Sequence, residues 1–358
     1  MRKVSSEVLA KLTYSTDLDE YDFDGLRAAI RKDDLINPFV PENYVRTDPR
    51  NGERVLYSLA RAQRPMTTKE ETRPELRHID SCPLCNGETT SFIDVTPLSE
   101  GHTLINKNLY PAIYPHQMTN EAEPAFGMHF LQWSSTLHDK DIHNMPKSDC
   151  RIIIDRLALL EEKLLHSASK KEHKAYVGII KNYGFLAGGS LSHGHQQIVY
   201  SNVAPRKIVD DERFLSERSQ SFADYLMKTN DESLTIASFG PIKAVTPHFM
   251  LRPLHTILLF QGEPCEYLHH LSDGQRDGLV EAFGKLLPAI IETMPKIGRL
   301  PCFNIVFHCG PIGQMYIEIH AYTQEIAGLE HLGLYVCQGT PEQSAQMLKE
   351  ATKNVTHK

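Results

Sequence analysis

The sequence predicts a mixed α/β protein of the α+β kind, and three observations support that fold class. Short β-branched runs alternate with two long segments of helical periodicity. A helix-like segment followed by two strand-like segments occurs twice, at 148–203 and at 273–322. The 358 residues are 41% hydrophobic and 23% charged, which is typical of a globular enzyme with a sizeable core. We expect mostly antiparallel sheets with flanking helices.

In the first half, residues 1–45 are mixed and charged and predict a partly ordered arm. The Asp-Pro and Asn-Gly turn signals within 45–65 predict a hairpin. Strands are expected within 91–108 and at 128–135, then a helix with Ser148 as its N-cap, then strands at 175–184 and 195–203.

In the second half, strands are expected at 233–239, 243–254 and 256–260, a helix at 273–294, and strands at 303–310 and 314–322. Thr340, Pro341 and Gln343 predict the start of a final helix, because they match the capping-box pattern. The expected division is an arm at 1–45, a first domain at 46–204, a partly helical linker at 205–233 and a second domain at 234–358.

Charge and cysteine content narrow the classes of partner and compartment. A formal net charge of -7 argues against nucleic acid or an anionic membrane surface as the main partner. No signal peptide or membrane span is visible, and seven cysteines, an odd number, argue against a disulfide framework. We expect a cytoplasmic protein with reduced thiols. Five cysteines are expected to be buried core residues: Cys150, Cys265, Cys302, Cys309 and Cys337.

The segment CPLC places Cys82 and Cys85 in a proline-containing turn, where two thiolates can face one metal ion. A structural zinc site usually needs two further ligands, and the sequence has no second Cys-x-x-Cys. His138 and His193 are candidates for those ligands. A redox-active pair of thiols, or a turn without a function, remains an alternative interpretation of CPLC.

The segment GGSLSHGHQQIVY places His193, His195 and Gln197 on one face of an expected strand. If His193 holds a metal, a neutral His195 can attack phosphorus, because its unperturbed pKa is about 6.5. Gln197 can then donate a hydrogen bond to a phosphoryl oxygen. The alternative is a solvent-facing strand edge or a satisfied core pair of histidines. The sequence has no P-loop motif.

These motifs and the segment RTDPRNGERVLYSLARAQRP together resemble the galactose-1-phosphate uridylyltransferases, a duplicated branch of the histidine-triad superfamily. Further similarity lies in NKNLYPAIYP, WSSTLH, KNYG and the tail GLEHLGLYVCQGTPEQSA, so that it spans about residues 45–350. The resemblance implies two histidine-triad-like halves. It also implies a homodimer, the usual state of the family.

The resemblance implies a role for each matching residue. His195 would be the nucleophile and Gln197 the phosphoryl donor. Two Cys and two His would hold zinc, at Cys82, Cys85, His138 and His193. Substrate contacts would come from the nucleotide-binding Arg61, Arg64 and Asn108, the phosphate-binding Asn182 and Ser190, and the hexose-binding Glu330.

The family also has a second metal site made from a Glu and three His. The matching residues here are Glu212, His308, Glu318 and His320, with Glu318 standing where a His is expected, and the ion would be iron or zinc. Carboxylate can replace imidazole on such a metal. Other departures are Leu191-Ser192 for Asn-Pro, Gly194 for Pro, Gln196 for Gly, and Val336 for Gln.

The expected function is transfer of a nucleoside monophosphate between a nucleotide sugar and a sugar phosphate through a nucleotidyl-histidine. Interception of that intermediate by phosphate or water, giving a phosphorylase or hydrolase of nucleotide sugars or dinucleoside polyphosphates, stays open. So do a zinc-stabilised nucleotide-binding protein without catalysis and a structural zinc scaffold. Trp133 is expected in the core, and four histidines in loops or at the surface: His248, His255, His269 and His270.

Overall fold

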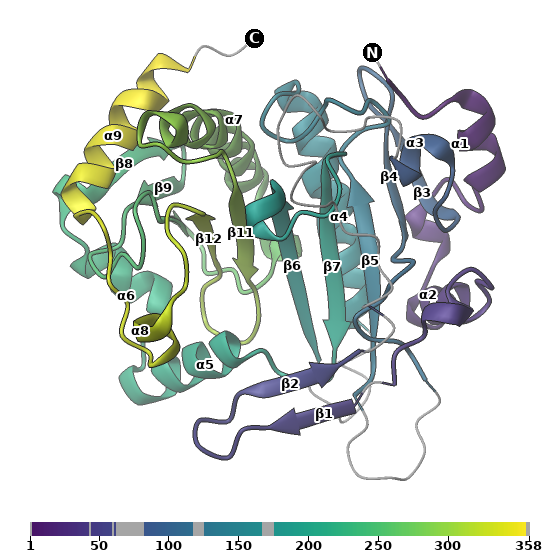
Figure 1. Cartoon of the computed structure of the whole chain (residues 1–358), viewed down its shortest axis with the longest axis horizontal. Helices are drawn as coiled ribbons and strands as arrows, with labels where there is room; N and C mark the ends of the chain where they lie inside the picture. The colour runs from purple at the N-terminus through teal and green to yellow at the C-terminus, as the bar shows by residue number, and fades with distance from the viewer. Residues whose placement is uncertain are drawn as a thin grey trace. The chain divides into compact units, whose positions relative to one another are not determined.

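The computed structural model describes residues 2–42, 44–58, 61, 82–116, 125–166 and 175–355. It divides into two compact units (Figure 1). The first comprises Met1–Asp141, Asp155–Ile179 and Ser190–Asp210, and the second Ile142–Ile154, Ile180–Gly189 and Asp211–Lys358. The predicted α/β class is confirmed by the mixture of helices and antiparallel strands. None of the described helices has the length and apolar character that crossing a membrane requires.

The first unit is built around strands in the order β3-β4-β5-β7, followed by β6, of which residues 176–179 belong to this unit. These strands are β3 (Phe92–Pro97), β4 (His102–Lys107), β5 (Gly127–Trp133), β6 (Tyr176–Tyr183) and β7 (His195–Ser201). The pairs β3–β4, β4–β5 and β5–β7 are antiparallel. Every residue of β5 is buried, which makes β5 and β7 a rigid support for side chains at their ends.

The N-terminal residues pack on this sheet as short helices, α1 (Ser6–Leu12), η1 (Leu18–Glu20), α2 (Phe23–Arg31) and η2 (Asn37–Phe39). Arg156 bridges Asp17 and the buried Asp94. The Lys107 ammonium lies 2.8 Å from a carboxylate oxygen of Asp33, and both side chains are nearly inaccessible. Such a buried pair is costly to break from one side only. The predicted arm is therefore held against the sheet in its described part.

Two local predictions for the first half have different outcomes. The hairpin is confirmed as β1 (Tyr44–Thr47) and β2 (Arg54–Tyr57), with Gly52 at a φ of 75° in the turn. The N-cap prediction is wrong, since α4 (Lys147–His166) begins one residue before Ser148. The CPLC turn forms α3 (Pro83–Asn86).

The second unit has the strand order β11-β12-β10-β9-β8. These strands are β8 (Thr235–Phe239), β9 (Ile242–Val245), β10 (Thr256–Phe260), β11 (Phe303–His308) and β12 (Tyr316–Ala321). The strand expected at 243–254 ends at Val245, because Pro247 lacks the amide that continued pairing needs. The segment predicted as a partly helical linker contains α5 (Arg206–Arg218), α6 (Phe222–Thr229) and η9 (Glu232–Leu234).

Two long helices cover part of this second sheet. Both α7 (Asp273–Lys296) and α9 (Pro341–Asn354) contact β8, and they pack against each other. The capping box predicted at Thr340 and Gln343 is confirmed. The remaining short helices are η8 (Phe185–Ala187), η10 (Leu268–His270) and α8 (Gly328–His331).

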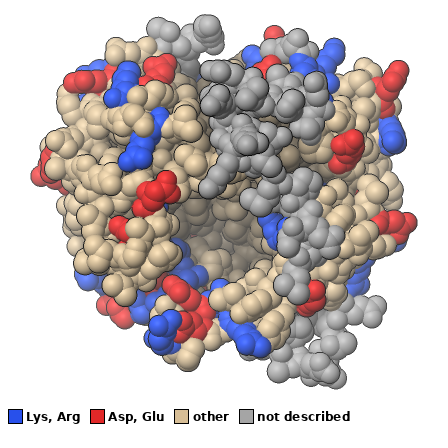
Figure 2. All heavy atoms as spheres, viewed as in Figure 1, with Lys and Arg blue, Asp and Glu red and all other residues tan. Residues whose placement is uncertain are grey.

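The predicted repeat of one helix followed by two strands is confirmed by α4-β6-β7 and α7-β11-β12. The polar pair noted in each repeat lies at its last strand. His195 begins β7 and His193 precedes that strand by two residues, whereas Glu318 and His320 both lie within β12. On the face in Figure 2, basic and acidic side chains are intermixed.

Candidate active site and metal centres

The four predicted zinc ligands converge in the first unit. Their ligating atoms, from Cys82, Cys85, His138 and His193, all lie within 4.8 Å of one another. His193 Nδ1 is 3.6 Å from the sulfur of each cysteine, and His138 Nδ1 is 3.5 Å from that of Cys85. A tetrahedral ion with bonds of about 2.3 Å to sulfur and about 2.0 Å to nitrogen holds its ligands about 3.5 Å apart. The four residues therefore fit a metal ion.

The outer nitrogens of both histidines support the same conclusion. His193 Nε2 donates to the carbonyl oxygen of Ser135 over 2.7 Å, and His138 Nε2 lies 3.1 Å from the hydroxyl of Ser192. A metal-bound histidine usually engages its second nitrogen in this way, which leaves Nδ1 with a lone pair for the ion. Ser192 thus has a function at the position where the family has proline.

The two thiols also favour a cation. A hydrogen bond with Cys85 lowers the pKa of Cys82, and the same hydrogen bond raises the pKa of Cys85. One proton is thus shared between two sulfurs, so the first thiolate forms easily and the second does not. A divalent cation removes that obstacle, because it stabilises both thiolates at once.

His195, the candidate nucleophile, is the first residue of β7 and pairs with Trp133 of β5. Its Nδ1 lies 2.9 Å from the carbonyl oxygen of His193, an acceptor, so Nδ1 carries the proton. Nε2 therefore keeps the lone pair that attack on phosphorus requires. Trp133 is 1% exposed, as expected for a core residue, and its ring centroid is 5.1 Å from that of His195.

The departures from the family pattern next to His195 are compensated locally. A Cβ atom at position 194 would lie 2.4 Å from Cγ of Asp141, so only glycine fits there. Ser134 donates to Asp141 over 2.7 Å and its amide donates to the Gly194 carbonyl oxygen. Gln196 Oε1 is 3.1 Å from the same Ser134 hydroxyl. The strand therefore starts at a fixed position without proline.

Of the predicted nucleotide contacts, Asn108 directly follows β4 and Arg61 lies beyond β2. Asn108 accepts a hydrogen bond from the amide of Tyr110, whose carbonyl oxygen accepts one from Arg61 over 2.8 Å. Gln197 and Asn108 both approach His129, which the sequence analysis did not single out. The available signal was a histidine inside an otherwise apolar strand.

Of the three remaining predicted nucleotide and phosphate contacts, two lie among the described residues. Ser190 belongs to the first unit and is half-buried. Asn182 belongs to the second unit, where its side-chain oxygen accepts a hydrogen bond from Asn304 over 2.8 Å. Arg64 lies outside the described residues.

The second predicted metal site has a different membership in the structure. Among the described residues, the ligating atoms within 4.8 Å of one another belong to His255, Glu318 and His320. The prediction that His255 lies in a loop or at the surface is correct for the loop, because His255 directly precedes β10. It is wrong for the surface, because the side chain is fully buried. Burial lowers the pKa of His255 to about 4, so this imidazole is neutral and able to bind a metal.

Glu318 is the centre of this second cluster. His308 and His320 lie 2.8 and 3.2 Å from one carboxylate oxygen, and His255 lies 3.3 Å from the other. Burial opposes ionisation of this carboxyl, but the hydrogen bonds with His255 and the other two histidines hold its pKa well below the usual value. Asp211, next to the predicted Glu212, brings its carboxylate 3.9 Å from His308.

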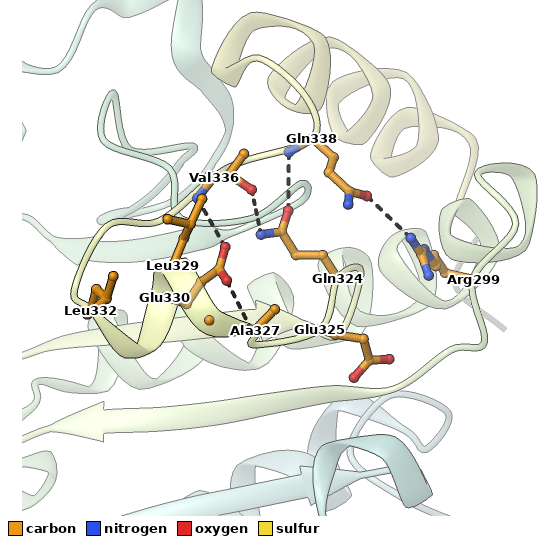
Figure 3. Close-up of a pocket in the computed structure, with 10 residues that line it drawn as sticks. Arg299, Gln324, Glu325, Ala327, Leu329, Glu330, Leu332, Val336 and Gln338 are labelled. Atoms are coloured by element: carbon orange, nitrogen blue, oxygen red, sulfur yellow. Dashed lines mark hydrogen bonds between the residues drawn. The ribbon is translucent and has the colours of Figure 1, made fainter.

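Glu330, the predicted hexose contact, lines a pocket of about 660 Å³ in the second unit (Figure 3). Its carboxylate accepts hydrogen bonds from the amides of Ala327 and Val336 over 3.0 and 3.2 Å. Hydrogen bonds from its own amide and from these two lower the pKa of Glu330. The side-chain NH₂ group of Gln324 also donates a hydrogen bond to the carbonyl oxygen of Val336. In the described structure, Glu330 therefore holds the loop 327–336 together.

Comparison with known proteins places this geometry in context. No protein-family model matches the chain. An ADP-glucose phosphorylase from Arabidopsis thaliana is 24% identical, over 86% of this chain and 93% of the relative. A galactose-1-phosphate uridylyltransferase from Rattus norvegicus is 26% identical, over 86% of this chain and 87% of the relative. The resemblance to the galactose-1-phosphate uridylyltransferase-like family is confirmed.

Solved structures agree on the fold of this chain. A uridylyltransferase structure covers 86% of it at a TM-score of 0.67 and 21% identity. The structure of an ADP-glucose phosphorylase from Arabidopsis thaliana with bound ADP-glucose covers 86% of it at a TM-score of 0.62 and 19% identity. In both comparisons the aligned region covers 98% of the solved chain. These likenesses confirm the fold. The two sequence relatives confirm the prediction of an enzyme of the nucleotidyltransferase or phosphorylase type.

Proposed function

We propose that this protein transfers a nucleoside monophosphate from a nucleoside-diphosphate sugar to a second phosphate-bearing acceptor, with His195 as the covalent carrier. The observation that carries the proposal is the hydrogen bond between His195 Nδ1 and the carbonyl oxygen of His193. It fixes the tautomer in which Nε2 is the nucleophilic atom.

In the first step, the Nε2 lone pair of His195 attacks the α-phosphorus. The bond between that phosphorus and the bridging oxygen breaks, and the sugar phosphate leaves with the electron pair. The product is a phosphoramidate in which the ring carries a positive charge. Because the Nδ1 proton already points at the His193 carbonyl oxygen, that charge is stabilised without a proton transfer.

In the second step, a phosphate oxygen of the acceptor attacks the same phosphorus and the phosphorus–nitrogen bond breaks. The electron pair returns to Nε2, and Nδ1 keeps its proton throughout. The ring therefore ends each cycle in its starting tautomer. Two in-line displacements would retain the configuration at phosphorus. Gln197, Asn108 and Arg61 are the proposed contacts to the nucleotide and its phosphates.

We propose zinc as the ion held by Cys82, Cys85, His138 and His193, because this donor set and spacing are typical of tetrahedral zinc. His193 precedes the nucleophile by two residues, so the ion would anchor the start of β7. A second ion, iron or zinc, is proposed at His255, Glu318 and His320. Its role would be structural.

A second candidate reaction uses inorganic phosphate as the acceptor. It is favoured by the relative named ADP-glucose phosphorylase, which matches 86% of this chain. The first step is unchanged. The product of the second step would be a nucleoside diphosphate in place of a new nucleotide sugar.

The test is covalent labelling with a panel of uridine- and adenosine-diphosphate sugars, detected by intact mass. We expect the wild-type protein to gain one nucleoside monophosphate and His195→Gly to gain none, a loss of at least about 10³-fold in labelling rate. Adding phosphate or a hexose 1-phosphate to the labelled protein then identifies the acceptor by the product released. Binding without label in either protein would reject catalysis and support a nucleotide-binding protein. Absence of both would support a zinc scaffold.

The remaining proposals concern assembly and location. We propose a homodimer. We also propose a cytoplasmic location, consistent with cysteines that form no disulfide bond. Domain boundaries near residues 45, 204 and 233 remain part of this proposal.

A further inference from the structure

His129 lies in the middle of the buried strand β5, and one of its ring nitrogens accepts a hydrogen bond from the backbone. The amide of Ala112 donates to Nδ1 over 3.0 Å. A backbone amide always carries its hydrogen, so this nitrogen must supply a lone pair. Nδ1 therefore has no proton, and the ring proton is on Nε2.

The position of that proton decides how the neighbouring Gln197 is oriented. His129 Nε2 lies 3.1 Å from Oε1 of Gln197. Because Nε2 carries the hydrogen, it donates, and only the oxygen of the glutamine amide can face it. The Gln197 NH₂ group then points away from His129, where it can donate to a phosphoryl oxygen.

We propose that His129 is a positioning residue that fixes the amide orientation of Gln197 for the transfer reaction. The inference rests on the proposed function, in which Gln197 contacts the phosphoryl group. Without the donor at Nε2, the glutamine amide can rotate and present its oxygen to the phosphate, where two electron-rich atoms repel each other.

Strand geometry explains why the two side chains meet. In the β5–β7 register, Leu131 faces Gln197 and His129 faces Val199. His129 and Gln197 are thus diagonal neighbours on one face of an antiparallel pair, within reach of each other. His129 is 2% exposed and Gln197 is 8% exposed. The contact is sheltered, so competition from water is weak.

The same proton also restricts Asn108. Its Oδ1 accepts the Tyr110 amide over 2.9 Å, so its NH₂ group is the part that lies 3.0 Å from His129 Nε2. Two donors cannot bond each other. With the proton on Nε2, this contact places two donors 3.0 Å apart, so the Asn108 NH₂ group is held there by the Oδ1 bond to Tyr110 and not by His129.

The experiment compares His129→Asn with His129→Gln. The asparagine oxygen can replace Nδ1 as the acceptor for Ala112 but leaves no donor at the position of Nε2. The glutamine NH₂ group can reach the position of Nε2. We expect the rate constant for nucleotidyl-histidine formation to fall about 10²-fold in His129→Asn and less than about 10-fold in His129→Gln. The dissociation constant for the nucleotide sugar should change less than about threefold in both.

A double variant tests whether His129 acts through Gln197. We expect His129→Asn to have no further effect on the labelling rate in a Gln197→Ala background, because the group it orients is gone. Independent, multiplying losses would overturn the inference. So would equal losses in the asparagine and glutamine variants.

Two further readouts separate this inference from stability and from the proposed function. Ring ¹⁵N chemical shifts of wild-type His129 must show an unprotonated Nδ1, and a protonated Nδ1 overturns the inference even if a variant fails to fold. If wild-type protein forms no covalent label, the proposed function fails. If it is labelled and His129→Asn is labelled at the same rate, only the positioning role fails.

Discussion

The histidine clusters beside β7 and at β12 hold their imidazoles in different ways. In the first, hydrogen bonds direct the outer nitrogens of His193 and His138 toward neutral oxygens, so their Nδ1 atoms face two sulfurs. In the second, imidazole nitrogens of His308 and His320 already face an anion, the carboxylate of Glu318.

The hydrogen-bond partners of the imidazoles therefore matter as much as the identity of the ligands in defining a metal site. The Cys82–Cys85 pair cannot lose both protons without a cation, whereas Glu318 is stabilised as an anion by the histidines around it. An ion entering the second cluster must compete with hydrogen bonds between its own ligands. We therefore expect the first cluster to bind a metal much more tightly than the second.

Cys82→Ser should have the largest effect of any change to either cluster. It removes one of four ligands, so we expect metal content to fall by about one equivalent and affinity at this site to fall well over about 100-fold. The start of β7 would lose its anchor, and the melting temperature should fall by about 10 °C or more. Elemental analysis and calorimetry measure both quantities.

Cys150→Ser is the matched control, because this buried thiol donates to the carbonyl oxygen of Ile142 and is not part of either cluster. A hydroxyl can make the same bond. The control should keep its metal. Equal metal content in wild type and Cys82→Ser would contradict the assignment of the first cluster.

Glu318→Gln should have the next largest effect. The change leaves buried histidines without the carboxylate they share, and we expect the free energy of unfolding to fall by about 3 kcal/mol. The second, weaker equivalent of metal should be lost as well. Denaturant unfolding measures the first effect, and elemental analysis during titration with a chelator measures the second. Glu325→Gln, at an exposed carboxylate in the same unit, is the control.

The motif residues of the first unit could be predicted because β-strand spacing is local. His193, His195 and Gln197 lie within five residues. Alternate residues of an extended segment lie on the same face, and pairing of β7 with β5 keeps that arrangement in the fold. The repeat of a helix and two strands was visible for the same reason. The local capping-box pattern also located the start of α9, with Thr340 as its N-cap.

What could not be predicted depends on contacts between distant segments. His255 joins Glu318 from a loop 63 residues earlier in the chain, and no spacing rule connects them. Asp141 explains the glycine at 194, but only the fold brings them together. The role of His129 depends on the amide of Ala112, a backbone group that any residue would supply.

Gly194→Ala tests whether the first repeat depends on close packing as well as on metal ligation. Its Cβ would lie 2.4 Å from Cγ of Asp141, so the backbone next to His195 has to shift. We expect a loss of about 2 kcal/mol in unfolding free energy and a labelling rate reduced more than about 10-fold. Gly178→Ala is the control, because its nearest atom is 3.9 Å away. Unchanged labelling in Gly194→Ala would show that Asp141 does not hold the strand.

Glu330→Ala should have the smallest effect and extends the comparison to a second carboxylate of the second unit. Like Glu318, Glu330 has its charge satisfied within the protein, here by the amides of Ala327 and Val336. Removing it should open the loop, speed hydrogen exchange in residues 327–336, and raise KM for the sugar-bearing substrate about three- to tenfold with little change in kcat. Glu330→Gln keeps one acceptor oxygen and should give an intermediate exchange rate. If KM rises equally in both variants while exchange in the glutamine variant stays at the wild-type rate, the carboxylate contacts the sugar directly, and loop closure is not its main function.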